Sequence, residues 1–212
     1  MCFTVKATTK ASKLAERYSV HTDIEDAIRS VEEKRSGFDH PELPVVVQGA
    51  LTPMRWGLIP VWVKTREEAL EIQNHTLNAR GESVFEKPSF KDAIHNRRCV
   101  IPVEAFYEWQ HVGKEKIPFL IKPSTEPLFS LAGIWEVWKS PQTATPVKTF
   151  SILTCVANSL MAEIHNSARR MPVILSLEAA CEWIEPGLPV PRIRELAAPC
   201  PEEWLVAERI AV

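Results

Sequence analysis

The stretch of the chain that decides the fold is residues 117–156, IPFLIKPSTEPLFSLAGIWEVWKSPQTATPVKTFSILTCV. It holds three runs rich in apolar and β-branched residues, and each run is bounded by turn-forming residues such as proline and serine. The three runs are Ile117 to Ile121, Leu128 to Trp135 and Lys148 to Val156, with turns at 123–127 and 140–142. Short strands joined by short turns favour an antiparallel sheet or a barrel over alternating strand and helix units.

The rest of the chain adds further strands and short helices to this core. Apolar runs predict strands at 44–48, 53–60 and 100–109 and a final strand or packed arm from 204, whereas helical patterns cover 10–18, 66–73, 88–94, 160–164, 176–184 and 192–197. A further helix is predicted to begin at Thr22, because Thr22-Asp23-Ile24-Glu25 is a capping box. We therefore expect an α+β fold, a single compact domain over residues 1–212 with a mainly antiparallel, barrel-like β core and peripheral short helices.

Composition and charge exclude several classes of protein. The chain has 212 residues, a formal net charge of −2 and a pI near 6.3, which argues against a protein that coats nucleic acid non-specifically, although a short local contact fits. There is no signal peptide pattern and no apolar run of membrane-spanning length, so we expect a cytoplasmic protein. No P-loop, GxGxxG or His-rich motif occurs, so no cofactor and no metal are expected.

The cysteines fit a reducing compartment. They are five in number, widely spaced and without a CxxC pair, which argues against a disulfide framework or a zinc site. Cys155 lies in a predicted strand and Cys181 on a predicted helix, and we expect both to be buried.

The chain begins Met1-Cys2-Phe3-Thr4. An aminopeptidase removes the initiator before a small residue, so the mature chain is expected to start at Cys2. A free α-amine has a pKa of about 7.7–8.0 and a thiol one of about 8.5, which leaves two adjacent nucleophiles near neutral pH. Both can add to one aldehyde carbon and close a thiazolidine ring, or the thiolate can attack an acyl carbon with the amine as its base. Many chains begin this way without any such chemistry, so Cys2 needs support from other segments.

Two other segments have residues suited to a site. Residues 76–82, TLNARGE, are rich in hydrogen-bonding groups and form either a surface turn or a site loop. Glu108 stands between Tyr107 and Trp109, and in a strand it would share a face with Phe106 and not with its two neighbours. A carboxyl group that loses water among aromatic rings suits a general acid near pH 7, whereas an edge position would turn it to solvent.

A third segment contains a histidine near basic residues. His165 follows a predicted helical turn and precedes Arg169-Arg170. A lone histidine is usually structural, but one beside a basic pair at the end of an element is a reasonable acid, base or phosphate-facing group.

Taken together, these segments resemble the SRAP family, the SOS response-associated peptidases or abasic-site processing proteins. The resemblance rests on Met1-Cys2, Asn78-Ala79-Arg80-Gly81-Glu82, Tyr107-Glu108-Trp109, His165 and the run that starts Arg170-Met171-Pro172. It extends in order over nearly the whole chain. The combination is specific, although each motif alone is weak.

The resemblance implies an activity and four catalytic residues. Members cross-link themselves to abasic sites when the N-terminal cysteine forms a thiazolidine with the ring-opened deoxyribose. By motif, Cys2 is the nucleophile, Asn78 holds the cysteine and the sugar, and Glu108 transfers protons. His165 would help to open the sugar and to assist β-elimination, a lyase-type step, or reversal of the cross-link. The peptidase name then describes at most autoproteolytic removal of Met1.

The resemblance also implies a partner, which is single-stranded DNA that contains abasic sites. Arg80 and Arg170 would hold phosphates, and Trp56 would support a base or the wall of the groove. No cofactor, metal or membrane is implied, and the protein is expected to act as a monomer in the cytoplasm, at the nucleoid when DNA is damaged. A few cations and stacking rings are enough to bind one damaged strand, which agrees with a net charge near zero.

Two departures from the family pattern mark a variant subfamily. The resemblance implies a start of Met-Cys-Gly-Arg for most members, whereas Phe3-Thr4 follow Cys2 in this chain, so an arginine expected to contact phosphate is missing. The spacing from His165 to Arg170 is also longer, because residues 166–169 intervene.

Two other functions remain open from the sequence. One is an N-terminal-nucleophile peptidase or amidohydrolase, in which Cys2 attacks an amide, although such proteins are expected to have a Gly-rich opening strand. The other is a non-enzymatic reader of modified single-stranded DNA in which Cys2 is inert.

Overall fold

Five strands close into a barrel at the centre of the protein. The structure is a computed structural model and describes residues 2–24, 34–140 and 145–211. The barrel strands are β4 (Glu42–Val47), β5 (Ala50–Trp56), β7 (Arg98–Val103), β10 (Phe129–Lys139) and β11 (Pro146–Val156). Strand β10 pairs antiparallel with β7 and β11, and β4 pairs antiparallel with β5 and β7. The parallel pairing of β5 with β11 completes the ring.

Four short strands extend this sheet at its margins. They are β2 (His21–Thr22), β6 (Asn78–Arg80), β12 (Arg170–Pro172) and β13 (Ile174–Leu175). Strands β6 and β12 both pair with β11, β6 in parallel and β12 antiparallel. The segments around Asn78 and Arg170 therefore lie on the two sides of one barrel strand.

Close packing inside the barrel depends on Gly133. It pairs with Cys99 on β7 and with Ile152 on β11, and a β-carbon at this position would come within 2.9 Å of the carbonyl oxygen of Ser151. The barrel also contains a stacked pair of rings, Trp56 and Phe150, whose centroids are 6.0 Å apart. Both rings are fully buried, so they contribute strongly to the hydrophobic core.

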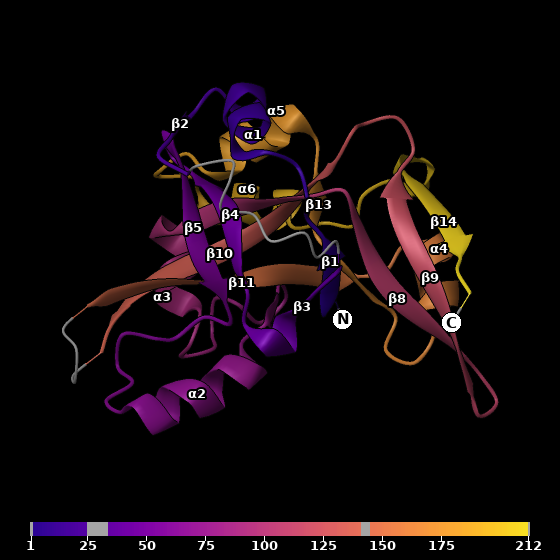
Figure 1. Cartoon of the computed structure of the whole chain (residues 1–212), viewed down its shortest axis with the longest axis horizontal. Coiled ribbons are helices and arrows are strands. Elements are labelled where there is room, and N and C mark those ends of the chain that lie inside the picture. The colour runs from indigo at the N-terminus through magenta and orange to yellow at the C-terminus, as the bar shows by residue number, and fades with distance from the viewer. Residues whose placement is uncertain (1, 25–33, 141–144, 212) are drawn as a thin grey trace.

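A second, smaller sheet carries the start of the chain. Its order is β14 (Leu205–Arg209), β9 (Glu115–Pro123), β8 (Ala105–Val112), β1 (Thr4–Lys6) and β3 (Lys34–Ser36), all antiparallel. Figure 1 shows β8, β9 and β14 side by side at one end of the molecule, with β1 and β3 between them and the barrel. The N-terminal segment is thus tied to β8 by strand pairing.

Within the described part of the chain, six short α-helices lie around the sheets (Figure 1). They are α1 (Ala11–Tyr18), α2 (Arg66–His75), α3 (Lys91–Asn96), α4 (Ser159–Ile164), α5 (Leu177–Trp183) and α6 (Val190–Leu196). Helix α2 begins at a capping box, in which Thr65 Oγ1 accepts from the amide of Glu68 and the Glu68 side chain accepts from the amide of Thr65. Among the residues described here, no helix is long and apolar enough to cross a membrane.

The predicted fold class is confirmed, because the chain is α+β with a mainly antiparallel, barrel-like core and short peripheral helices. Three local predictions need comment. The helix predicted from Thr22 falls mostly outside the described residues, and Thr22 itself ends β2. Residues 78–80 form strand β6, so the candidate loop at 76–82 is partly a strand. The prediction that Cys181 is buried is wrong, because α5 turns Ala180 and Trp183 to the core and leaves Cys181 exposed; Cys155 is buried as expected.

Candidate active site around Cys2

Cys2 lies immediately before β1 and is held by an amide from a distant strand. Its carbonyl oxygen accepts a hydrogen bond of 2.9 Å from Nδ2 of Asn78. The thiol is fully buried, and burial, reinforced by the nearby Glu108 carboxylate, raises the pKa of Cys2 well above its ordinary value. In the chain that retains Met1, Cys2 is therefore a neutral, protonated thiol shielded from solvent, and its role as the nucleophile stays a prediction.

Asn78 is positioned by the barrel. Strand β6 runs parallel to β11, with Asn78 opposite Ile152. The preceding carbonyl, that of Leu77, accepts a hydrogen bond of 2.8 Å from the indole Nε1 of Trp56. Among the described residues, the buried Oδ1 of Asn78 has no hydrogen-bond partner. A buried amide oxygen that lacks a donor is costly, so this atom is suited to a hydroxyl or amine supplied by a ligand or by the processed chain terminus.

Glu108 is a buried carboxyl group on β8. Its side chain is only 3% exposed, which excludes the solvent-facing edge position. The alternation expected for a strand holds, because Phe106 and Glu108 are buried while Tyr107 and Trp109 are partly exposed. Burial raises the pKa of Glu108 to about 7, against the opposing positive charge of the amino terminus. A carboxyl group with this pKa both donates and accepts a proton near neutral pH.

His165 lies at the end of α4 and is held through one ring nitrogen. Its Nδ1 is 2.8 Å from the carbonyl oxygen and 3.2 Å from the amide nitrogen of Arg170. Burial lowers the pKa of His165, and the charge of the amino terminus lowers it further. The imidazole is therefore mainly neutral at pH 7, and the same terminal charge acts on both Glu108 and His165.

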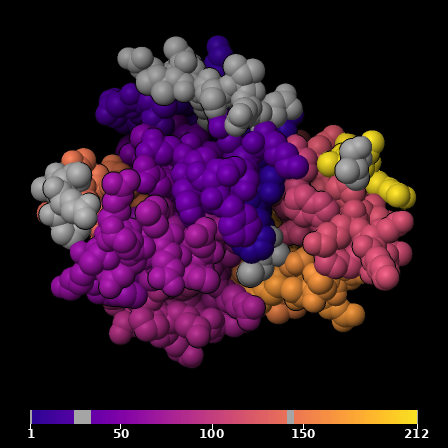
Figure 2. Space-filling view, turned by 60° about the horizontal axis from the view of Figure 1, so that its bottom comes forward, coloured from indigo at the N-terminus to yellow at the C-terminus, as the bar shows by residue number. Residues whose placement is uncertain are grey.

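The segment around His165 contacts β8 through side-chain hydrogen bonds. Asn166 Oδ1 accepts from the amide of His111 at 3.0 Å, and Asn166 Nδ2 donates to the carbonyl of His111 at 2.8 Å. Gln110 Nε2 also donates to the carbonyl of Glu163 at 3.1 Å. These contacts fix the α4 segment against β8, the strand that carries Glu108. In Figure 2 the indigo start of the chain lies against the pink β8–β9 segment.

The three residues expected at DNA have different environments. Arg80 is exposed beside Asn78. Arg170 is only 9% exposed, and its guanidinium donates two hydrogen bonds to Glu82, at 2.6 and 2.9 Å, as well as two to Thr154. Its charge is therefore balanced within the protein, and a phosphate contact by Arg170 stays a prediction. Trp56 is fully buried inside the barrel, where its indole donates to the carbonyl of Leu77, and a role in supporting a base or the groove wall stays a prediction.

Two features of the site were missed from the sequence. Glu82 stands in the Asn78-to-Glu82 motif, but nothing in the sequence indicates that it pairs with Arg170, 88 residues away. Phe38 lies in none of the recognised motifs, yet its ring is 5.1 Å from that of Phe3, the residue that follows Cys2. Among the described residues, no group of three or more His, Cys, Asp or Glu side chains is arranged to hold a metal ion.

Cys2 lies next to the start of the chain at the side of an α+β barrel, where Asn78 holds it and the buried Glu108 carboxyl group influences it. This arrangement defines the class of protein, one with a candidate N-terminal cysteine nucleophile. Residues 1–211 match the family described as SOS response associated peptidase (SRAP). The chain belongs to the SRAP family.

Similar proteins carry related names. Over 137 residues the chain is 42% identical to the abasic site processing protein YoqW of Bacillus subtilis (strain 168), covering 64% of this chain and 58% of that protein. It is 33% identical over 155 residues to the abasic site processing protein HMCES of Gallus gallus, covering 64% and 45%. The matched region is thus less than two thirds of the length of either relative.

Solved structures have the same fold. A crystal structure of a protein from Bacteroides thetaiotaomicron is 38% identical, with a TM-score of 0.95 over 99% of this chain and 92% of that one. A protein from Bordetella bronchiseptica is 21% identical with a TM-score of 0.84, a likeness that concerns the fold alone.

Proposed function

We propose that this protein processes abasic sites in single-stranded DNA by forming a covalent thiazolidine cross-link between Cys2, after removal of Met1, and the ring-opened deoxyribose. The observation that carries the proposal is the contact of Asn78 with Cys2, beside the buried Glu108 carboxyl group. The names of the relatives YoqW and HMCES support it.

The first chemical task is to open the sugar. An abasic deoxyribose is mostly a closed hemiacetal, and opening needs a proton on the ring oxygen and loss of one from the hydroxyl group at C1′. Glu108, with a pKa of about 7, is suited to donate the first proton, and the neutral His165 is suited to accept the second. Two groups with different environments thus divide the acid and base roles.

The second task is to capture the aldehyde. The amine of Cys2 adds to the carbonyl carbon, and the carbinolamine loses water to give an imine. The sulfur then forms a bond to the same carbon, while the thiol proton moves to the nitrogen, so atoms and electrons balance. Because sulfur and nitrogen stand on neighbouring carbons, the effective concentration of the sulfur at the imine carbon is very high. If β-elimination follows from the imine, the activity is lyase-type. Met1 is removed by an aminopeptidase or by the protein itself.

The DNA is held by few contacts. The exposed Arg80 lies next to Asn78 and is suited to a phosphate on the strand. We expect the protein to act as a monomer at damaged DNA in the nucleoid. An N-terminal-nucleophile peptidase and an inert reader of modified DNA are the competing functions, and the following experiment separates them.

The test is to mix the protein with a single-stranded oligonucleotide that contains one abasic site and to separate the products on a denaturing gel. We expect a complex that survives denaturation, because a thiazolidine is a covalent bond. An intact oligonucleotide of the same sequence is the control and should give none. Binding without a stable complex would favour the inert reader, and amide hydrolysis without DNA capture would favour the peptidase.

His165 yields a separate prediction about later steps. Replacing His165 by glutamine should slow strand cleavage or release of the cross-link by roughly a hundredfold, as expected for loss of an acid-base group, and slow initial capture less. Rates of capture, cleavage and release are measured on the same abasic oligonucleotide. The matched control is His75→Gln, an exposed histidine at the end of α2. Equal slowing of all three steps would reject this role.

A further inference from the structure

A pair of phenylalanine rings lies directly beside Cys2. Phe3 and Phe38 have ring centroids 5.1 Å apart and planes tilted by 35°. Phe3 is partly buried, whereas Phe38 is 54% exposed, a large exposed fraction for an aromatic ring. The pair therefore presents an exposed aromatic surface next to the residue that follows Cys2.

The pair is held rigidly to the barrel. The amide of Gly37 donates to the carbonyl of Phe3 at 2.7 Å, and the hydroxyl of Ser36 accepts from the amide of Phe38 at 3.3 Å. Any β-carbon at position 37 would lie 3.2 Å from the ring of Trp56, so glycine allows this turn to approach the indole. Rigid placement matters, because a ring that is already ordered loses little conformational entropy when something stacks on it.

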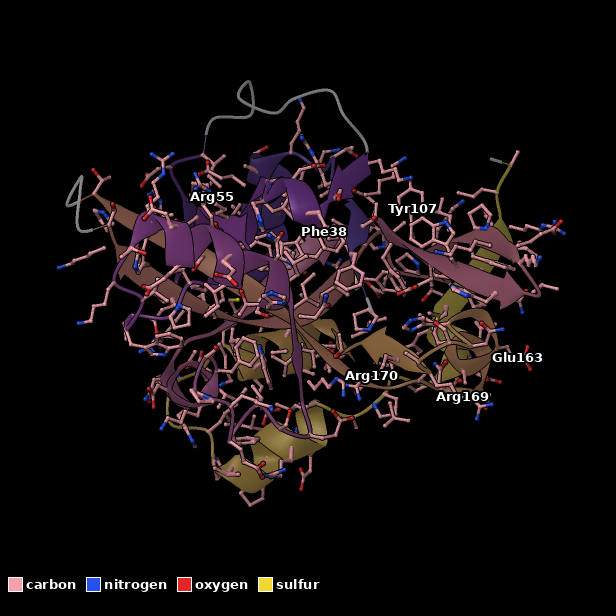
Figure 3. The ribbon with its side chains drawn as sticks, turned by 90° about the horizontal axis from the view of Figure 1, so that it is seen from below. Phe38, Arg55, Tyr107, Glu163, Arg169 and Arg170 are labelled. Carbon is pink, nitrogen blue, oxygen red and sulfur yellow. The ribbon has the colours of Figure 1, made fainter. Side chains whose placement is uncertain are left out.

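Cations and further rings lie on the nearby strands β3 and β8. Strand β3, which precedes Phe38, carries Lys34 and Arg35. The ammonium of Lys34 lies 5.0 Å from the centroid of the Tyr107 ring and 5.8 Å from that of Trp109. Figure 3 shows Phe38 and Tyr107 on one side of this face and Arg169 and Arg170 on the other. Rings interspersed with positive charge are what single-stranded nucleic acid binds, through stacking and phosphate contacts.

We infer that the Phe3–Phe38 pair is a stacking platform for the nucleobase next to the abasic site, an inference that rests on the proposed function. Phe3 directly follows the nucleophile Cys2, so their α-carbons are about 3.8 Å apart. Stacked bases in a strand are spaced by about 3.4 Å. When the deoxyribose is bound at Cys2, the adjacent base is therefore within reach of the exposed face of Phe38. Because every base has a π face, the platform accepts any of the four bases.

A nucleobase fits this place better than a protein partner. The pair adjoins the residue that would capture the sugar, and basic side chains flank it. An abasic site also has no base to stack within its own strand, which leaves the neighbouring base unpartnered on one side. Stacking on phenylalanine replaces that lost contact.

The test compares protein and DNA changes in one cycle. The probe is single-stranded DNA with a central tetrahydrofuran, an abasic analogue without an aldehyde, so binding stays non-covalent and is measured by fluorescence anisotropy. In matched probes the 5′ or the 3′ neighbour is a second tetrahydrofuran. We expect Phe38→Ala to weaken binding roughly tenfold when both neighbouring bases are present. With the probe that lacks the stacking base, Phe38→Ala and the parent should bind with equal affinity. Phe38→Trp should bind each probe as the parent does.

Controls separate this outcome from loss of folding. Val206→Ala removes an apolar side chain of similar exposure, 41%, from β14 and should bind as the parent does. If Phe38→Ala is less stable than the parent, Phe38→Leu replaces it, because leucine keeps the apolar bulk without the π face. As with Phe38→Ala, its loss of binding should be seen with both neighbouring bases present and should vanish with the probe that lacks the stacking base. The inference would be overturned if Phe38→Ala bound the probe with both neighbouring bases as tightly as the parent does. It would also be overturned if Phe38→Ala weakened binding by the same factor with and without the neighbouring base, and a protein partner would then be the remaining occupant.

The cycle is also independent of the cross-link. If the platform is correct and the proposed function is wrong, the cycle shows coupling, but a true abasic oligonucleotide gives no stable complex. If the proposed function is correct and the platform is wrong, the complex forms and the coupling is absent.

Discussion

Replacing Cys2 by alanine is expected to abolish the covalent complex with abasic single-stranded DNA, lowering its yield by two orders of magnitude or more. The amine can still form an imine, but without sulfur no ring closes and the imine hydrolyses. The loss is large because the effective concentration of an adjacent thiol, on the order of 10⁵ M or more, is lost outright. The measurement is the fraction of oligonucleotide retained by protein after denaturation.

Cys181 supplies the matched control for this experiment. It is the exposed cysteine on α5, so Cys181→Ala removes an accessible thiol without touching the site. That variant should cross-link as well as the parent does. A residue or tag that blocks the α-amine of Cys2 should have the same effect as Cys2→Ala. If Cys2→Ala cross-links as efficiently as the parent, the proposed mechanism is wrong.

Replacing Glu108 by glutamine is expected to slow cross-linking on the order of a hundredfold while binding to tetrahydrofuran-containing DNA changes little. Glutamine keeps the shape of the protonated carboxyl group but transfers no proton. In the parent, the acid form is lost as the pH rises through about 7, so the rate of sugar opening should fall above that pH. The variant should lack this fall. An unchanged rate in Glu108→Gln would remove the acid-base role.

The same raised pKa affects stability, and its sign is definite. Burial raises the pKa of Glu108 from 4.5 to about 7, so folding favours the protonated form. The stability that this gives is fully present below pH 4.5 and is lost as the pH rises through 7. Denaturant unfolding at pH 5 and pH 8 should show Glu108→Gln gaining stability relative to the parent at the higher pH. Glu208→Gln, on β14 and exposed, is the control and should show no such gain.

Much of the fold could be predicted, because local pattern and strand chemistry are encoded within short windows. The three strands of residues 117–156 and the helices near α1, α2 and α4 lie where their apolar periodicity indicates. The closure of the barrel could not be predicted in the same way, because the parallel pairing of β5 with β11 joins residues about ninety positions apart. The prediction that Cys181 on α5 is buried was also wrong, because the apolar stripe of a helix does not show which neighbouring element will cover the helix.

The site shows the same division. By itself the sequence determined the kinds of group that are present: a cysteine beside the start of the chain, the asparagine and carboxyl groups in recognisable motifs, and a histidine before a basic pair. Only the tertiary structure decided their state. Folding buried Cys2 and Glu108, paired Arg170 with Glu82, enclosed Trp56 in the barrel and set Phe3 against Phe38. The physical reason is that protonation, charge balance and exposure depend on loss of water and on partners distant in sequence, and neither is a property of a residue type.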